Sequence, residues 1–344
     1  MTSSSEESKG SPIPGDVAQE DKARGSLAIA GTQEGRGYEW TCVTENAAFA
    51  ARDGAGALAH KGRMWLLGGW NPEDKVHFPR ICNSEVWSST DGAIWTLENG
   101  EAPWEGRHTA GYVVHKGKMW IVGGDANQHY YQNDIWCSDD GVNWDLVNGH
   151  VPWPPRVLHY TVAFDDRIWV MGGQTLPPFA PAEDAFYNDV WCSEDGVDWT
   201  QVAANAAWPP RGMIGGNVVF QGRMWILGGG TYDTPHYPNR LFFNDVWSSA
   251  DGVDWEMSLN SAPWEPRQYH DVAVFDDKMW VLEGWNQCNR RDVWYSSDGA
   301  NWHELPDTPW IERHAASVFV HDNALWMVAG NNMRPDVWRL TRRR

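Results

Sequence analysis

One glutamate and two histidines of this chain have the side chains and the unusual positions expected of acid–base groups. Glu283 stands directly before a glycine and replaces the first of the two glycines that earlier copies of the same short pattern have. His108 and His314 each follow an arginine directly, which the other copies of that arginine pattern do not repeat. Burial would raise the pKa of Glu283 toward neutral pH, where a carboxyl group is an effective proton donor or acceptor. The alternative is a glutamate that simply pairs with Arg290 or Arg291.

Four histidines stand close behind repeated arginines and would form a metal site if the fold brought them together. They are His108, His159, His270 and His314. Imidazole nitrogen is a common ligand of zinc, copper and iron, but the spacing of these four does not show that they converge. His159 and His270 follow their arginines by three residues and have a simpler structural interpretation. We therefore predict no cofactor, and a metal ion stays the alternative.

A second group of polar and aromatic side chains suits ligand binding. Five of them directly follow a repeated pair of residues that ends in glycine, and two amides come next in the chain: Trp70, Asp125, Gln174, Trp285 and Asn331, with Asn71 and Asn286. Others lie in the variable segments that follow: His129, Tyr131, Tyr187, Tyr232 and His236. Exposed indoles beside amides and a carboxylate suit a planar, polar ligand, such as an aromatic metabolite, a sugar-like ring or a peptide side chain.

These residues occur within a pattern that the chain repeats six times. A seven-residue segment with a tryptophan at its third position, hydrophobic residues around it and a glycine at its end recurs at 63–69, 118–124, 167–173, 223–229, 278–284 and 324–330. An arginine precedes each copy, at Arg52, Arg107, Arg156, Arg211, Arg267 and Arg313. An acidic residue before Val-Trp or Ile-Trp follows each copy, at Glu85, Asp134, Asp189, Asp245, Asp292 and Asp336. Intervals of about 46 to 56 residues indicate an array of supersecondary units, and short apolar runs between Gly and Asp-Gly turns indicate strands.

The glycine pair, the downstream tryptophan and the arginine that opens the next unit resemble the Kelch family of β-propellers, within the galactose oxidase-like superfamily. The resemblance covers about residues 38 to 340 and implies an all-β, six-bladed propeller with four antiparallel strands per blade. The sixth unit has only three strands before the chain ends, and residues 38–43 look like the missing one. We predict that this N-terminal strand closes the last blade and removes its open edge.

The predicted domain organisation follows from these repeats. Residues 1–36 are rich in Ser, Gly and charge and are predicted to be a disordered tail, and 37–344 form the propeller. The blades are predicted at 54–99, 109–148, 158–203, 213–259, 269–305 and 315–340, the last with strand 38–43.

Residues that recur in every blade are expected to be scaffold. The repeated arginines and acids are placed to form Arg–carboxylate pairs, and the aspartates of the Asp-Gly turns, which resemble a shortened sialidase Asp-box, are expected to organise hairpins. Most of the 25 tryptophans fall at repeating positions and are expected to pack between strands and blades. We therefore expect the functional residues in the long loops on one face of the propeller, whose sequences differ between blades. We predict that these loops form a cup over the channel mouth, with the residues after each glycine pair at its floor.

Composition limits the partners. The formal net charge of −19 would repel nucleic acid and anionic membrane surfaces. No apolar run is long enough for a membrane span, and the N-terminus lacks the pattern of a secretory signal. The five cysteines show no paired spacing, which is typical of a reduced protein. We expect a cytoplasmic monomer whose partner is a small molecule or peptide.

Three function classes stay open at this point. The first is a module that binds a small polar or aromatic molecule or a peptide in the cup. The second is an enzyme, because the Kelch resemblance includes sialic acid epimerases: an isomerase or epimerase, a lyase or a cyclase that uses Glu283 with His108, His314 or a loop tyrosine. The third is a protein-interaction adaptor. The copper site of galactose oxidase and the iron motif of nitrile-specifier proteins have no match that can be placed in this sequence.

Overall fold

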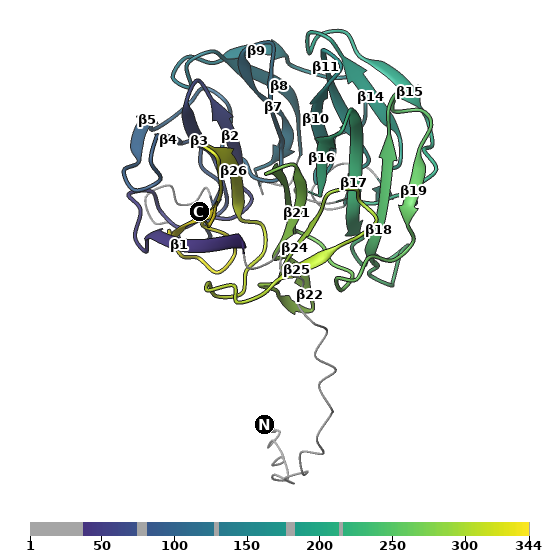
Figure 1. The fold of residues 1–344 in the computed structure, drawn as a ribbon. Helices are drawn as coiled ribbons and strands as arrows, with labels where there is room; N and C mark the ends of the chain where they lie inside the picture. The colour runs from purple at the N-terminus through teal and green to yellow at the C-terminus, as the bar shows by residue number, and fades with distance from the viewer. Residues whose placement is uncertain (1–36, 74–80, 127–130, 177–182, 213–215, 344) are drawn as a thin grey trace, which may run out of the picture. The chain divides into compact units, whose positions relative to one another are not determined.

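The computed structural model describes residues 37–343 apart from 74–80, 127–130, 177–182 and 213–215. The predicted tail and His129 lie outside the described residues. Within that part the chain is built from strands, and six four-stranded antiparallel sheets form a ring (Figure 1). This is a six-bladed β-propeller, as the repeats predicted. None of the described residues forms a helix with the length and apolar character needed to cross a membrane.

The first three blades share one strand order, in which each strand pairs with its neighbour in sequence. Blade one contains β2 Gly56–His60, β3 Arg63–Leu67, β4 Val86–Ser89 and β5 Thr96–Asn99. Blade two contains β6 Gly111–His115, β7 Lys118–Asp125, β8 Tyr131–Ser138 and β9 Asp145–Asn148. Blade three contains β10 Tyr160–Phe164, β11 Arg167–Met171, β14 Val190–Ser193 and β15 Thr200–Ala203, with the small pair β12 Gln174–Thr175 and β13 Ala185–Phe186 on its loop.

The next two blades repeat this order. Blade four contains β16 Asn217–Phe220, β17 Arg223–Gly230, β18 Phe242–Ser249 and β19 Glu256–Leu259. Blade five contains β20 Asp271–Phe275, β21 Lys278–Leu282, β24 Val293–Ser296 and β25 His303–Leu305, with the small pair β22 Trp285–Asn286 and β23 Cys288–Asn289 on its loop.

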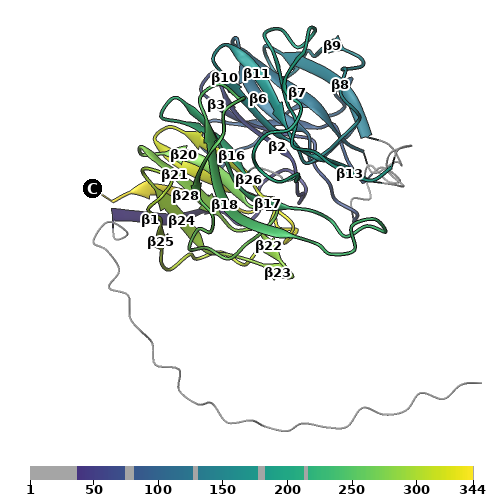
Figure 2. The same cartoon turned by 90° about the vertical axis from the view of Figure 1, so that its right-hand side faces the viewer.

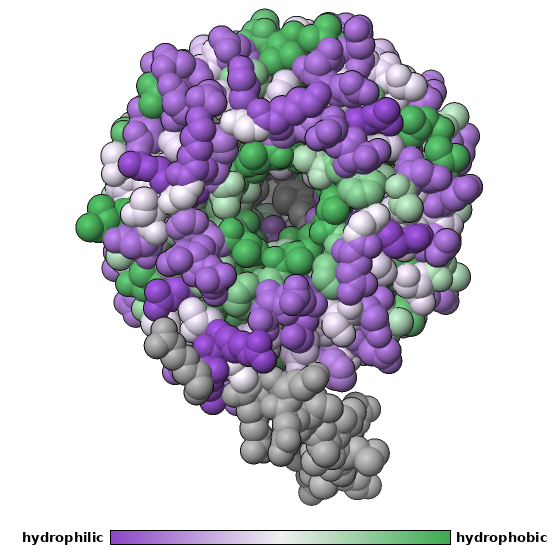
Figure 3. Space-filling model, turned by 45° about the horizontal axis from the view of Figure 1, so that its top comes forward, coloured by the Kyte–Doolittle hydropathy of each residue, from purple (hydrophilic) through white to green (hydrophobic). Residues whose placement is uncertain are grey.

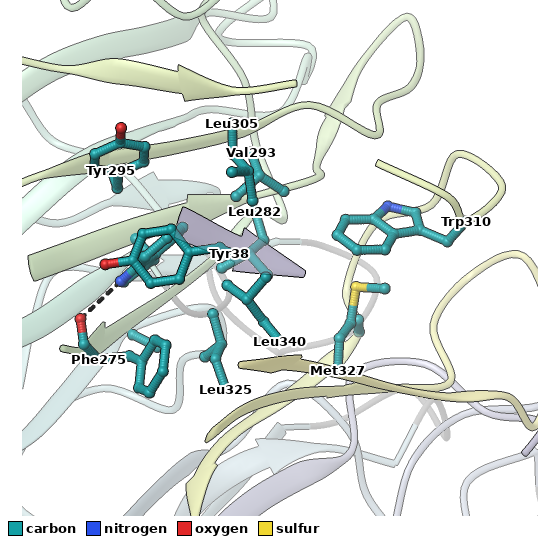
Figure 4. Packing of buried hydrophobic residues seen from close by; sticks show 13 residues of the cluster. Tyr38, Phe275, Leu282, Val293, Tyr295, Leu305, Trp310, Leu325, Met327 and Leu340 are labelled. Carbon is teal, nitrogen blue, oxygen red and sulfur yellow. Dashed lines mark hydrogen bonds between the residues drawn. The ribbon is translucent and has the colours of Figure 1, made fainter. Parts of the chain in front are cut away.

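Blade six combines strands from both ends of the sequence, which confirms the predicted closure. Its strands are β26 Ser317–His321, β27 Ala324–Val328, β28 Val337–Arg342 and β1 Tyr38–Thr44. β1 runs antiparallel to β28, with Tyr38 opposite Arg342 and Cys42 opposite Trp338, and Figure 2 shows the two strands side by side. Tyr38 packs in the core between blades five and six, where its ring meets that of Trp280 edge-on at 4.9 Å (Figure 4).

A buried ion pair occurs once in every blade and confirms the predicted Arg–carboxylate pairs. The pairs are Arg52–Glu85, Arg107–Asp134, Arg156–Asp189, Arg211–Asp245, Arg267–Asp292 and Arg313–Asp336, with N–O distances of 2.5 to 2.7 Å. Each arginine also donates to the carbonyl oxygen of the first residue of the glycine pair or of its replacement. Each carboxylate also accepts from the indole N–H of the tryptophan two residues later. The arginine therefore ties the entering chain to two strands of its own blade.

Edge-to-face aromatic pairs provide the second repeated contact. They are Phe49–Trp95, Trp104–Trp144, Trp153–Trp199, Trp208–Trp255, Trp264–Trp302 and Trp310–Trp40, with centroid distances of 4.2 to 5.9 Å. In blade six the partner, Trp40, comes from β1, whereas in the other blades it follows an Asp-Gly turn. β1 thus supplies both the missing strand and the missing aromatic contact.

The Asp-Gly turns organise hairpins, as predicted, and their glycines lie against a tryptophan of the preceding blade. Asp140 shows the arrangement: its Oδ1 accepts hydrogen bonds from the backbone N–H groups of Val142 and Asn143. The following Gly141 has a φ of 76° and lies so close to the Trp65 ring of blade one that a Cβ there would come within 2.1 Å. Only glycine satisfies both the left-handed backbone and this contact.

Gly141→Ala should destabilise the protein more than Gly117→Ala. Gly117 has nearly the same φ, 72°, but nothing lies within 4 Å of a Cβ placed on it. In both variants the left-handed backbone at the alanine lowers the unfolding free energy by about 1–2 kcal/mol. Only Gly141→Ala adds a clash with Trp65, which should lower it by about another 1–3 kcal/mol. Urea denaturation of the two variants measures the difference. Equal unfolding free energies would show that the interface between blades one and two adapts without cost.

Candidate functional site

The mouth of the channel is organised by backbone pairing between two repeated positions. The residue after each blade arginine pairs with the residue after the glycine pair, in the bridges Asp53–Trp70, His108–Asp125, Val157–Gln174, Gly212–Gly230 and Gln268–Trp285. In blade six, Asn331 N–H donates to the carbonyl oxygen of His314 at 2.9 Å. Every blade therefore places two adjacent residues, one from each repeated position, at the mouth of the channel.

The second residue after each blade arginine takes part in a belt of backbone hydrogen bonds between neighbouring blades. Its described members are Gly54, Thr109, Leu158, Tyr269 and Ala315, each with a φ between 51° and 56°. Leu158 N–H donates to Thr109, Thr109 to Gly54, Gly54 to Ala315 and Ala315 to Tyr269, at 2.8 to 3.4 Å. A left-handed backbone at a non-glycine residue is costly and persists only where surrounding contacts fix it. The belt lies between two cavities, and Thr109 lines both.

The larger cavity, which we call the cup, has a volume of about 710 Å³. Its lining includes seven of the predicted ligand-binding residues and two of the predicted acid–base histidines: Trp70, Asp125, Tyr131, Gln174, Tyr232, Trp285, Asn331, His108 and His314. A smaller cavity of about 170 Å³ is lined by first-strand residues of the blades, such as Ala57 and Val272. Figure 3 views the ring from the side opposite the loop strands β13 and β23 of Figure 2, and there a central hollow is bordered by apolar surface within a hydrophilic face.

Four predicted ligand-binding residues do not line the cup. The side-chain amides of Asn71 and Asn286 donate to the backbone carbonyl oxygens of Ala51 and Pro266, at 2.8 and 2.7 Å. The Tyr187 ring lies against the guanidinium of Arg156, 3.8 Å away. The exposed His236 is hydrogen-bonded to the Asp184 carboxylate. These side chains hold loops in place.

Glu283 also lies outside the cup. Its side chain is fully buried, its carboxyl group accepts from Gly284 N–H at 2.7 Å, and its neighbour is the carboxyl group of Asp271 on β20. Arg290 and Arg291 pair instead with Glu265 and Glu312, so the expected ion-pair alternative is not formed either.

Asp271 and Glu283 form a pair that shares a proton. Burial raises the pKa of Asp271 to about 7, even though a hydrogen bond from Glu283 acts to lower it. Burial, together with the charge of Asp271, raises the pKa of Glu283 well above its usual range. Two adjacent carboxyl groups in a low dielectric cannot both ionise, so the pair keeps a proton to higher pH than either group would alone.

The four histidines of the metal hypothesis occupy separate places. His108 and His314 line the cup, and His159 lines the smaller cavity, where its Nδ1 is 2.8 Å from Thr161 Oγ1. His270 is fully buried, with Nε2 2.9 Å from the carbonyl oxygen of Leu227. Burial lowers the pKa of both His159 and His270 to about 3, so both are neutral. Within the described part of the chain, no three His, Cys, Asp or Glu side chains are grouped as metal ligands.

The two cup histidines have opposite electrostatic environments. Burial acts to lower the pKa of His108, but Cys82, 3.4 Å from its Nδ1, and the carboxylates of Asp125 and Asp53 outweigh burial and raise it to about 10. Burial and then the charge of Arg240 lower the pKa of His314 to about 4. The cup therefore favours the charged form of His108 and the neutral form of His314.

Sequence reasoning missed Asp53, Tyr269 and Arg240, which also line the cup. Asp53 directly follows a blade arginine, the position at which His108 and His314 were recognised, so the same rule would have found it. Tyr269 follows its arginine by two residues, at the belt position. Arg240 lies in the aromatic-rich loop of blade four, and its charge among aromatic residues was the available signal.

Comparisons with known proteins add little. No family model matches the chain. Over 101 residues the chain is 32% identical to the leucine-zipper-like transcriptional regulator 1 homolog of Drosophila melanogaster. The matched region covers 28% of this chain and only 10% of that protein.

Glu283→Gln should raise stability more at pH 8 than at pH 4. A carboxyl group whose pKa is raised by folding stabilises the protein below its unfolded pKa, and this contribution is lost as pH rises through the folded pKa. The loss should therefore begin near pH 4 and continue as pH rises through the raised folded pKa values of Asp271 and Glu283, and a neutral amide removes it. We expect a gain of about 1–3 kcal/mol in unfolding free energy at pH 8.

Chemical denaturation at the two pH values measures this effect. Glu312→Gln is the control, because it removes a carboxylate of a surface ion pair, where about half of the side chain is exposed. An equal change at both pH values would contradict the shared proton.

Proposed function

We propose that this protein is a binding module whose cup takes a small organic molecule with a carboxylate and a flat ring. The observation that carries the proposal is the placement of Arg240. Its guanidinium carbon lies 4.0 Å from the ring centroid of Tyr232 and 4.4 Å from that of Trp285. Its Nε donates to Gln268 at 3.0 Å and one terminal nitrogen donates to the Tyr269 hydroxyl at 3.4 Å.

No described carboxylate pairs with Arg240, in contrast to the six scaffold arginines. Two rings and two hydrogen bonds fix the orientation of its guanidinium, while hydrogen-bonding capacity is left for a ligand. A planar guanidinium with unused N–H donors matches the geometry of a carboxylate. Because the fold already holds the Arg240 side chain in one orientation, ligand binding loses little side-chain entropy.

The other walls of the cup favour a ring in the same ligand. Five aromatic side chains line it: Trp70, Tyr131, Tyr232, Tyr269 and Trp285. A volume of about 710 Å³ lies within the usual range of about 300–1,000 Å³ for small-molecule sites. Flat rings stack on such side chains, whereas a protein partner generally needs a wider surface.

We assign the propeller to the Kelch type as part of this proposal. The glycine pair, the arginine before it and the tryptophan after it make the same contacts in each blade, with Glu283 and Ala329 in place of one glycine in the last two blades. This agreement of motif and contact supports the resemblance beyond the sequence pattern.

Arg240→Gln should weaken binding of 3-indolepropionate and 3-phenylpropionate at least tenfold, because the amide loses the charge and the paired donors. Arg240→Lys should recover only part of the affinity, since an ammonium cannot bind both carboxylate oxygens in the same plane. Isothermal titration calorimetry measures both. Arg334→Gln, at an exposed arginine outside the cup lining, is the control. Unchanged affinity in Arg240→Gln, or no binding to the wild-type protein, would overturn the proposal.

A proton-transfer enzyme, such as an isomerase or epimerase, is the second candidate. Acid–base sites hold two titratable groups whose environments separate their pKa values, and His108 and His314 fit this description on one cup. Glu283 is no longer its candidate, because it does not line the cup.

NMR titration of the histidine Cε1–H signals tests this second candidate. His108 should stay protonated at pH 8 and His314 should stay neutral at pH 6, with His108→Gln and His314→Gln used for assignment. If both rings titrate near the ordinary value of about 6.5, the candidate loses its support.

A further inference from the structure

We propose that the ligand of the cup is a zwitterion, with its carboxylate on Arg240 and an ammonium-type group at an acidic corner formed by Asp53 and Asp125. This inference rests on the proposed function, because it concerns the same cup. It adds the second charged group and therefore the chemical class of the ligand.

The acidic corner lies where blades one and two meet. Asp53 pairs through its backbone with Trp70, and Asp125 pairs in the same way with His108. Both carboxylate side chains line the cup although each residue is only 7% exposed. Two carboxylates beside a single histidine leave this corner with a net negative charge.

Asp53 is the member of the corner with hydrogen-bonding capacity left. Its Oδ2 accepts from Asn331 Nδ2 at 3.1 Å, and no other hydrogen bond to this carboxylate occurs among the described residues. Burial disfavours its charge, and His108 offsets only part of that penalty. A partly desolvated carboxylate that lines the cup with only one protein donor can accept from a ligand ammonium, which would supply both the proton and the charge.

The anionic and cationic groups lie on opposite sides of the ring. Asp53 and Asp125 belong to blades one and two, whereas Arg240 and its partners Gln268 and Trp285 belong to blades four and five. In a ring of six, blade one is opposite blade four and blade two is opposite blade five. A ligand that contacts both corners must therefore span the cup.

This arrangement selects against ligands with only one charge. A simple carboxylate would satisfy Arg240 but leave the net negative charge of the acidic corner unbalanced, and a simple amine would leave Arg240 without a counter-charge. A zwitterion satisfies both, and each unsatisfied corner acts against the wrong ligand.

Two sets of three probes, each sharing one ring system, test the inference by calorimetry. They are tryptophan, 3-indolepropionate and tryptamine, and phenylalanine, 3-phenylpropionate and phenethylamine. We expect the amino acid of at least one set to bind at least tenfold more tightly than its matched acid and amine. Asp53→Asn should reduce the affinity for the amino acid to that for the acid. Asp125→Asn serves as a second variant if Asp53→Asn unfolds, and Asp233→Asn, at an exposed loop residue, is the control.

The outcomes separate the two proposals. Acids that bind as tightly as the amino acids would overturn the zwitterion and leave the proposed function intact, and so would an unchanged amino-acid affinity in Asp53→Asn. Amines that bind most tightly, with no effect of Arg240→Gln, would overturn both. Failure of all six probes to bind the wild-type protein would also overturn both.

Discussion

The buried arginine at the start of each blade is the interaction on which the rest of the structure depends. Each of these side chains is at most 1% exposed and binds both a carboxylate and a backbone carbonyl oxygen of its own blade. Removing one would leave an uncompensated carboxylate inside the protein, which costs far more than the pair itself contributes. The two residues that follow the arginine form the mouth of the cup and the belt below it. The scaffold pair therefore also fixes the position of functional side chains such as Asp53, His108 and His314.

The net charge of the protein bears on the kind of ligand that the cup can hold. With 46 acidic and 27 basic residues, the protein repels an approaching anion at long range. A molecule with no net charge avoids this repulsion and still uses Arg240 at short range. The overall charge and the arrangement inside the cup thus favour the same class of ligand for independent reasons.

Repeated positions explain why the sequence predicted so much of this molecule. The arginine pair recurs in six units and the Asp-Gly turn in five, always at the same place, so the copies of a local signal support one another and predict the ring; the closing strand was predicted because the sixth unit lacks one. The floor of the cup was predicted for the same reason, because the residue after each glycine pair occupies one repeated level. Arg240 was missed because it lies in a loop whose length and sequence differ from blade to blade, so the repeat does not predict its position. Glu283 was misplaced because the register of the β20–β21 hairpin, which pairs Asp271 with Leu282 and so brings it beside Glu283, was not taken into account.

The pairing of β1 with β28 imposes an order on folding. Strands β2 to β5 and each later blade pair with near neighbours in sequence, whereas Tyr38 must meet Arg342 from the far end of the chain. Local pairings form quickly and distant ones slowly, so the sixth blade is the last to be completed. Until then the edge of β28 is open, and Tyr38 and Trp40 lack the aromatic partners that they have in the closed ring. At high protein concentration a second molecule can offer its own β1 to that edge, so exchange of this strand is a low-cost route from monomer to dimer for such a ring.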